Sequence, residues 1–388
     1  MDDAIYADES IYEYPMQQGG GNDGRPYSFG RPSSGGSKAA YPCKSYGQGR
    51  INPAYFYGVF DPNDMRRDVS ITMTGSNGKG VEKLIPFVPN SKAEGGGLTL
   101  NKWDENRQAN PWVAAQRKSG INGPYMRMSE VYLGYAEVCA ALGDVVTGKQ
   151  YLKTVRERSF PQGLANTDAF IASFGNDLVR AIIEERGFEY AGEGDRRWTL
   201  IRSGYLPEDI KRIKDMTKAM MDGLATKGYY EFENGNIISA YIWTKLVDAK
   251  TIYGHRLTAQ CPTDKVNDPV LYPGWRGQKD NWEEMGLNYG SSTPATNLAI
   301  KGLFEIVSEE EAASLESQGY TKVNWGIDLV DNRDEYDKYL FWDYDYVSAP
   351  IYLWPFPPNV MAAGGFTNGY GFKPVSYTHL TLPTSELV

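Results

Sequence analysis

Aromatic and polar side chains are interleaved between residues 272 and 289, in loop-like sequence. The candidate ligand contacts are Tyr272, Trp275, Arg276, Asp280, Asn281, Trp282 and Tyr289, with Gln278 and Asn288 between them. A Trp or Tyr ring presents a flat apolar face that stacks on a sugar ring, while amide, carboxylate and guanidinium groups hydrogen-bond the sugar hydroxyls. These residue types therefore suit stacking on sugar rings or contact with a partner. The alternative is that the rings anchor a loop-like insertion to the rest of the fold.

A second, smaller cluster of the same kind lies upstream. Trp103 and Trp112 stand near Asn101, Asn106 and Asn110. Because an aromatic platform flanked by amides meets the same requirement for holding a sugar, these residues form the second candidate site. The whole chain is rich in such rings, with 28 Tyr, 14 Phe and 9 Trp, and many of them stand beside Gly, Pro, Asn or Asp.

Paired carboxylates would allow a different chemistry, the hydrolysis of a glycosidic bond. Asp343 and Asp345 alternate in the run FWDYDY, so both could face one side of a strand as an acid and its partner. Any polar strand face shows the same spacing, so the sequence favours binding without catalysis. Asp61, Asn63 and Asp64 offer oxygen ligands for calcium, but the loop spacing and final glutamate of an EF-hand are missing. No metal or cofactor is predicted.

Histidine and thiol chemistry is nearly excluded by the small number of these residues. The chain has two histidines, His255 and His379, and three cysteines, Cys43, Cys139 and Cys261, without CxxC spacing. Neither a disulfide framework, a thiolate metal site nor a histidine triad is expected, and Cys139 is predicted to lie in the core. A net charge of −9 without a basic stripe disfavours nucleic acid and anionic lipid as partners. No apolar run is long enough to span a membrane.

One of the helices that must position a site carries a column of negative charge. Glu185, Glu189 and Glu193 are spaced four residues apart, so they stack on one helix face and repel each other. The arginines close in sequence that could form ion pairs with these glutamates are Arg156, Arg158, Arg186, Arg196, Arg197 and Arg202. We expect a partly buried ion-pair network that includes Arg186 and Arg202 together with the three glutamates. Arg202→Ala is therefore expected to destabilise the fold strongly.

Two helices are predicted before this column. The first starts at Pro124 and ends at Gly143. Its packing stripe, at spacings of three and four residues, is Met128, Tyr132, Tyr135, Cys139 and Leu142. The second runs from Asp144 to Arg158 and is expected to bury Tyr151, Leu152 and Val155.

The acid-striped helix and a short helix after it complete the block. The first is expected to begin at a cap of Asn176 or Asp177 and to end at Gly192 or Gly194. Its predicted buried residues are Leu178, Ala181, Ile182 and Phe188. The short helix, residues 196–202, is expected to direct Trp198 and Ile201 inward. Consecutive helices joined by short turns should pack antiparallel, as tetratricopeptide pairs do.

The remaining sequence is predicted to form loops with short strands, within a single domain of residues 1–374. A loop-rich part (1–121) contains a strand-like run at 69–74, and the helical core (122–204) follows. An aromatic loop insertion (205–300) begins with a Lys- and Met-rich helix and a hairpin that turns at Asn234 and Gly235. Short mixed elements fill a C-terminal part (301–374). Residues 375–388 resemble a translated adapter sequence and are expected to be poorly packed.

Several runs resemble motifs of the SusD/RagB family of outer-membrane glycan-binding lipoproteins. The run 126–142 (MRMSEVYLGYAEVCAAL) and the run 151–158 (YLKTVRER) are similar to two helices of that family, with Lys153 in place of Asn. Residues 185–202 resemble its ER-x-x-EF-x-x-EG-x-R-x-x-DL-x-R pattern, with Thr199 in place of Asp. YLWPFPP (352–358) and TNGYGF (367–372) resemble its terminal motifs, and the runs 8–14 and 61–68 resemble weaker upstream patterns.

The resemblance implies a mostly α fold, a tetratricopeptide-like helical scaffold with large loop-rich additions and a few short β-hairpins. It implies non-catalytic capture of oligo- or polysaccharide at the outer surface of the outer membrane, for a SusC-like TonB-dependent transporter. The lipid-anchoring cysteine and the first helices are expected upstream of residue 1, so that the chain is truncated at its N-terminus. The matched residues are expected to be scaffold, because the binding residues of this family lie in variable loops.

Two alternatives remain open from the sequence. One is a soluble tetratricopeptide-type module that binds a peptide. The other is a glycoside hydrolase that uses Asp343 and Asp345 as its carboxyl pair.

Overall fold

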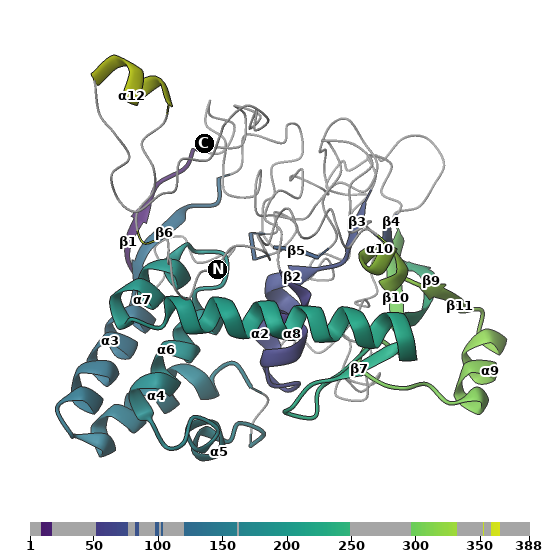
Figure 1. Cartoon of the computed structure of the whole chain (residues 1–388), viewed down its shortest axis with the longest axis horizontal. Helices are drawn as coiled ribbons and strands as arrows, with labels where there is room; N and C mark the ends of the chain where they lie inside the picture. The colour runs from purple at the N-terminus through teal and green to yellow at the C-terminus, as the bar shows by residue number, and fades with distance from the viewer. Residues whose placement is uncertain are drawn as a thin grey trace.

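The structure is a computed structural model that describes residues 9–17, 52–76, 82–84, 98–100, 102–103, 120–160, 163–248, 296–331, 352 and 358–364. Within these residues helices predominate, and the short strands form small separate sheets (Figure 1). The predicted mostly α architecture with a few short hairpins is therefore confirmed. Residues 272–289, the FWDYDY run and residues 375–388 lie outside the described residues.

Consecutive helices form the central block of the molecule. Their bounds are α3 (Met128–Ala141), α4 (Val145–Glu157), α5 (Thr167–Ala172), α6 (Leu178–Glu189), α7 (Asp195–Ser203) and α8 (Leu206–Lys227). Only the turn 142–144 separates α3 from α4, so the two helices pack side by side and antiparallel, as predicted (Figure 1). Gly143 in this turn has φ +87°, a conformation that favours glycine.

Side-chain caps determine where these helices begin. In α4, α5 and α6 the cap oxygen accepts a backbone N–H of the first turn, and these caps are Asp144 (3.1 Å), Asn166 (2.9 Å) and Asp177 (3.0 Å). Each cap satisfies a donor that the first turn leaves unpaired, a contribution of about 1 kcal/mol. The predicted starts at Asp144 and Asp177 are thus confirmed. Helix α6 ends at Glu189, before Gly192, and Gly194 precedes α7 instead.

Two large apolar clusters among the described residues support the block, beside a small one formed by Ile183, Leu200 and Leu206. The first fills the space between α3, α4 and α6 with Leu133, Ala136, Leu152, Val155, Ala181 and Ile182. The second lies beneath α8, which runs from the helical block toward the strands (Figure 1), and includes Phe56, Phe60, Phe188, Met220, Phe232 and Ile238. The buried residues predicted for α6 are confirmed, and so are Leu152 and Val155 of α4.

The predicted packing stripe of α3 is confirmed at Cys139, but elsewhere it is wrong by about one position. Residues 123–127 form a strand, β6 (Gly123–Arg127), so Pro124 does not start the helix. The buried side chains of α3 are Ser129, Leu133, Ala136 and Cys139, whereas Tyr135 is 50% exposed and Leu142 is 81% exposed. The small residues allow α4 and α6 to pack closely against α3. The Tyr135 ring lies on the surface, edge-on to Tyr151 at 5.0 Å between centroids.

The orientation predicted for α7 is also wrong at one residue. Trp198 is 56% exposed, and the helix buries Thr199 and Leu200 instead. Thr199 is buried because its hydroxyl donates to Asp195 (2.8 Å) and accepts from Arg186 Nε (3.1 Å). A polar anchor thus sets the rotation of this short helix.

The strands form ribbons around the helices. The sheets are β1 (Ser10–Tyr14) with β6, β2 (Ile71–Thr72) with β5 (Thr99–Leu100), β3 (Thr74–Ser76) with β4 (Glu82–Leu84), β7 (Tyr229–Glu231) with β8 (Ile237–Ser239), and β9 (Tyr241–Asp248) between β10 (Thr296–Lys301) and β11 (Thr321–Asn324). Every pairing is antiparallel. The hairpin predicted at Asn234 and Gly235 is confirmed as β7–β8, with Gly235 at φ +84°.

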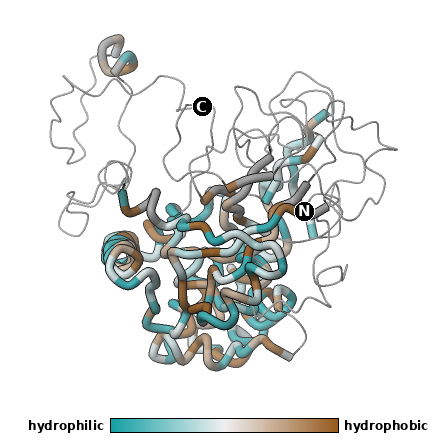
Figure 2. The backbone as a smooth tube through the Cα atoms, turned by 90° about the vertical axis from the view of Figure 1, so that its right-hand side faces the viewer, coloured by the Kyte–Doolittle hydropathy of each residue, from teal (hydrophilic) through white to brown (hydrophobic). Residues whose placement is uncertain are grey.

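Short helices complete the described residues. They are η1 (Ala54–Val59, a π-helix), α2 (Met65–Ser70), α9 (Glu309–Ser317), α10 (Gly326–Asp331) and α12 (Pro358–Gly364). The strand predicted at 69–74 is correct only in its second half, because α2 continues through Ser70. Hydrophobic and hydrophilic positions alternate closely along the described backbone (Figure 2). Of the described helices, none combines the length and the apolar content needed to cross a bilayer.

Two glycine-to-alanine changes within helices are expected to have opposite effects on stability. A Cβ on Gly187 of α6 would meet the Tyr55 hydroxyl and lie 2.6 Å from Arg196 Nη1, so Gly187→Ala should cost about 1–3 kcal/mol. A Cβ on Gly134 of α3 meets nothing within 4 Å, so Gly134→Ala should stabilise by about 0.5–1 kcal/mol. Urea unfolding of both variants measures the two effects. Equal changes in the same direction would contradict this packing.

Candidate functional site

Basic side chains from several elements form ion pairs with the glutamates of the acidic column of α6. Glu185 is fully buried and lies 2.8 Å from Arg156 Nη1 and 2.7 Å from Arg66 Nη1. Glu189 pairs with Arg66 at 2.9 Å and also with Arg127 and Arg158. These contacts join α6 to α2, to β6 and to the end of α4, so one row of carboxylates holds three other elements in register.

The column continues past the end of α6. Glu193 lies 2.9 Å from Arg127 Nη2 and pairs with Lys102. We call the whole set the α6 network: Arg66, Lys102, Arg127, Arg156, Arg158, Glu185, Glu189 and Glu193. The predicted partly buried network is therefore confirmed for its three glutamates.

The charge of Glu189 depends on this network. Burial alone would raise the pKa of this carboxyl group. The guanidinium groups of Arg127, Arg66 and Arg158, with the Lys102 ammonium, outweigh burial and hold the pKa well below its usual range. Glu189 is therefore ionised in the folded protein, and its partners compensate the buried charge.

The arginines of this network differ in part from those predicted. Arg156 and Arg158 take part, but the strongest partners, Arg66 and Arg127, lie far upstream in the sequence. Arg186 bonds Asp195 instead, at 2.6 Å. Arg202 lies on the surface with its side chain 53% exposed, where it pairs with Glu137, so its predicted place in the network is wrong. Surface pairs contribute about 1 kcal/mol or less, so Arg202→Ala is expected to have a small effect on stability in place of the strong one predicted from the sequence.

A second buried cluster ties α6 to α7 and α8. Glu184 lies 2.8 Å from Arg196 Nη2 and 3.0 Å from Arg212 Nη2. Asp209 contacts the same two arginines at 2.9 and 2.7 Å. Burial would raise the pKa of Glu184, but Arg196 and Arg212 outweigh it and lower the pKa to about 2.

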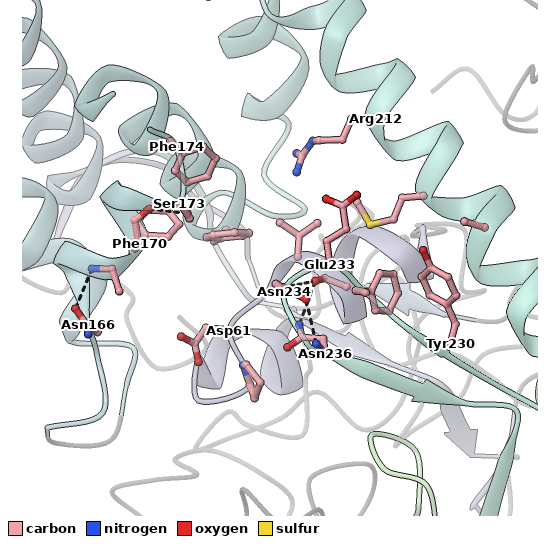
Figure 3. Close-up of a pocket in the computed structure, with 18 of the residues that line it drawn as sticks. Asp61, Asn166, Phe170, Ser173, Phe174, Arg212, Tyr230, Glu233, Asn234 and Asn236 are labelled. Carbon is pink, nitrogen blue, oxygen red and sulfur yellow. Dashed lines mark hydrogen bonds between the residues drawn. The ribbon is translucent and has the colours of Figure 1, made fainter. Parts of the chain in front are cut away.

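These two clusters hold in place the walls of a cavity of about 760 Å³ between α5, α8 and the β7–β8 hairpin. We call this cavity the hairpin groove. Its aromatic lining residues are Phe170, Phe174, Phe188, Tyr230 and Phe232. Its polar and charged lining residues are Asp61, Arg156, Asn166, Ser173, Arg212, Asp215, Glu233, Asn234 and Asn236. Figure 3 shows Phe170 and Phe174 on one side and Glu233, Asn234 and Tyr230 on the other.

The hairpin wall of the groove is fixed to the segment around η1 by two amides. Asn234 Nδ2 donates to the Gly58 carbonyl at 2.7 Å. The buried Asn236 donates from Nδ2 to the carbonyls of Phe60 (2.8 Å) and Gly58 (3.1 Å). These bonds satisfy carbonyl groups that η1 leaves without partners, and they set the position of Glu233 at the rim.

On the α5 side of the groove, Arg156 packs against the aromatic lining residues. The Arg156 guanidinium lies over the Phe170 ring at 3.8 Å from its centroid, and Phe170 meets Phe174 edge to face at 5.3 Å. Since Arg156 is also paired with Glu185, the α6 network reaches the groove directly. The groove can thus offer apolar ring surface together with amide and carboxylate groups to a ligand.

Some of the predicted site residues are among the residues that the structure describes, and others are not. Residues 272–289, Trp112 and the Asp343–Asp345 pair lie outside the described residues. Trp103 is described and is only 1% exposed, so this ring belongs to the core and the prediction of a binding platform there is wrong. Asp64 caps α2 and pairs with Arg66 at 2.6 Å, and Asp61 Oδ1 accepts the N–H of Asn63. In the described part of the chain, no cluster of His, Cys, Asp and Glu is arranged to hold a metal ion.

Relatives of this chain were found among curated proteins and solved structures. The SusD-like protein P25 of Formosa agariphila is 28% identical over 160 residues, which is 41% of this chain and 26% of that protein. A SusD homologue from Bacteroides thetaiotaomicron is 18% identical with a TM-score of 0.38, over 55% of this chain and 44% of that one. Surface glycan-binding protein A from the same organism, in complex with laminarihexaose, is 19% identical with a TM-score of 0.35, over 54% of this chain and 47% of that one.

The extent of the family match is much greater than that of these pairwise matches. The chain spans about a quarter of the length of its curated relative and less than half of each solved structure. The model of the SusD family, in contrast, matches residues 5–363, which is nearly the whole chain. It includes the runs at 126–142, 151–158 and 185–202 whose contacts are described above. The chain belongs to the SusD family.

Proposed function

We propose that this chain captures oligo- or polysaccharide at the outer surface of the outer membrane without cleaving it, and delivers it to a SusC-like TonB-dependent transporter. The observation that carries this proposal is membership of the SusD family over residues 5–363. A lipid anchor upstream of residue 1 would hold the protein at the membrane.

The contact residues proposed for the glycan are those of the loop 272–289. They are Tyr272, Trp275, Arg276, Asp280, Asn281, Trp282 and Tyr289. Their rings would stack on pyranose faces, and their polar groups would bond hydroxyls. The ion pairs around α6 would keep the scaffold rigid while such a loop binds.

Replacing both loop tryptophans is the direct test of this platform. Trp275→Ala combined with Trp282→Ala should weaken oligosaccharide affinity by about tenfold or more, because two stacking surfaces are removed. Isothermal titration calorimetry with a panel of hexasaccharides, laminarihexaose among them, measures the change. Trp198→Ala is the matched control, because that ring is exposed on α7 and should not affect binding. Unchanged affinity in the double variant would reject the loop as the platform.

A further inference from the structure

We infer that the hairpin groove is a second carbohydrate subsite, and that it accepts an uncharged sugar unit while rejecting an anionic one. This inference rests on the proposed function, since it assumes that the chain binds glycan. It adds a site whose described lining residues belong to the helical scaffold and the β7–β8 hairpin, and it assigns the charge class of the sugar.

The groove has ring surface to offer on both walls. Phe174 and Tyr230 are partly exposed and line opposite sides (Figure 3). Each ring is held by an edge-to-face neighbour, Phe174 by Phe170 at 5.3 Å and Tyr230 by Phe232 at 4.9 Å. Rings fixed in this way lose little conformational entropy when a ligand stacks on them. The volume of about 760 Å³ is within the range of ligand sites and exceeds what a single monosaccharide fills.

Polar groups at the rim have capacity left for sugar hydroxyls. Asn166 uses its Oδ1 to cap α5, which leaves its NH2 group as a donor. Asp61 uses Oδ1 for the N–H of Asn63, which leaves Oδ2 as an acceptor. Glu233 is exposed at the hairpin turn and lines the groove. A sugar hydroxyl both donates and accepts, so it can bond groups of either kind.

The positively charged residues that line the groove are already ion-paired, whereas two of the negatively charged ones are not. Arg156 is paired with Glu185 at 2.8 Å, and Arg212 is paired with Glu184 at 3.0 Å and with Asp209 at 2.7 Å. Both cations are therefore already ion-paired with carboxylates of the two buried clusters. The lining carboxylate of Asp215 pairs with Lys211. Among the described residues, Asp61 and Glu233 have no ion-pair partner, so the unpaired charge that faces a ligand is negative.

This balance decides which sugars the groove can accept. An uncharged pyranose gains ring stacking and hydrogen bonds without an electrostatic penalty. A uronate or sulfated unit would bring its anion close to one or both free carboxylates, with no free cation among the described lining residues to compensate. Like charges at about 4 Å in a solvated site repel enough to weaken binding by about tenfold.

Filling the groove tests the site itself. Ala169 is exposed on α5 and lines the groove, so Ala169→Trp would occupy the space without removing a structural contact. Ala172→Trp is the matched control, on the same helix, exposed and outside the lining. In calorimetry on the full chain with laminarihexaose, maltohexaose and mannohexaose, Ala169→Trp should weaken the binding of a neutral hexasaccharide by about tenfold, and the control should bind as the wild type does.

Removing one carboxylate tests the charge class. Wild-type protein should bind the neutral probes at least about tenfold more tightly than hexagalacturonate. Glu233→Gln should reduce this preference severalfold, whereas Glu231→Gln, an exposed glutamate of the same hairpin that does not line the groove, should leave it unchanged.

The outcomes separate this inference from the function on which it rests. If Ala169→Trp binds neutral glycans as the wild type does while the Trp275–Trp282 double variant does not, the groove is not a subsite and the capture function stands. Tighter binding of hexagalacturonate than of neutral probes would overturn the assigned charge class. If no probe of either class binds to the wild type, the capture function fails, and the subsite fails with it.

Discussion

Replacing Glu189 by glutamine is expected to lower the free energy of unfolding by about 3–5 kcal/mol. The change keeps the size of the side chain and removes its charge. Glu189 is buried and pairs with Arg66, Arg127 and Arg158, so glutamine would leave three guanidinium groups around a neutral amide. A buried charge that loses its partner costs far more than a surface pair contributes.

Urea unfolding followed by circular dichroism measures this effect, with Arg202→Ala as the control. Arg202 also pairs with a glutamate, but its side chain is 53% exposed, so its loss should cost about 1 kcal/mol or less. A loss from Glu189→Gln as small as that from Arg202→Ala would show that the α6 network does not stabilise the fold.

Glu184 is expected to make the stability of the protein fall in acid. Its pKa is lowered from an ordinary value of 4.5 to about 2 in the folded state, because Arg196 and Arg212 outweigh the effect of burial. A carboxyl group with a lowered folded-state pKa stabilises the fold above its unfolded pKa, and that contribution disappears as the pH falls through the folded value. Glu184 should therefore contribute about 3 kcal/mol above pH 4.5, and this contribution should be lost progressively toward pH 2.

Comparison with Glu184→Gln isolates this contribution. At pH 7 the variant should be less stable than the wild type by about 3 kcal/mol, since Arg196 and Arg212 lose the carboxylate between them. Below pH 4.5 the difference should shrink, and near pH 2 it should almost vanish, because Glu184 is then half protonated or more in both states. Urea unfolding at a series of pH values gives this curve. A difference that stays constant from pH 7 to pH 2 would contradict the role assigned to the two arginines.

The features that the sequence predicts well are local ones. Asp177 is recognised as a candidate cap, and Asp144 as the start of a helix, because a short acidic side chain before an apolar period satisfies free backbone donors. The β7–β8 hairpin follows from Asn234 and Gly235, since few residues other than glycine accept positive φ. Each of these signals lies within a few residues of the structure that it specifies.

The errors arise where partners are distant in sequence. Glutamates spaced four residues apart predict that cations must lie beside them. The neighbouring sequence does not show that Arg66 and Arg127 are those cations. On α3 the tyrosines look like the packing stripe, yet a tyrosine can also lie on the surface, and Leu133 and Ala136 form the interior instead. Periodicity alone does not distinguish the two faces when both carry apolar side chains.

The hairpin groove could not be predicted from the sequence for the same reason. Its walls come from the loop at Asp61, from α5, from α8 and from the turn after β7, which are separated by long stretches of chain. Asn166 and Asn234 are recognisable as cap and turn residues, and those local roles conceal that both line a cavity. Only the packing of α5, α8 and the hairpin brings them together.

The measurement that tests the capture function most directly is native affinity electrophoresis of the full chain in gels that contain neutral polysaccharides, with reducing ends assayed in parallel. The account predicts that at least one polysaccharide slows the protein and that no new reducing ends form during prolonged incubation. Migration unaffected by every polysaccharide, or a steady release of reducing ends, would contradict non-catalytic capture of glycan.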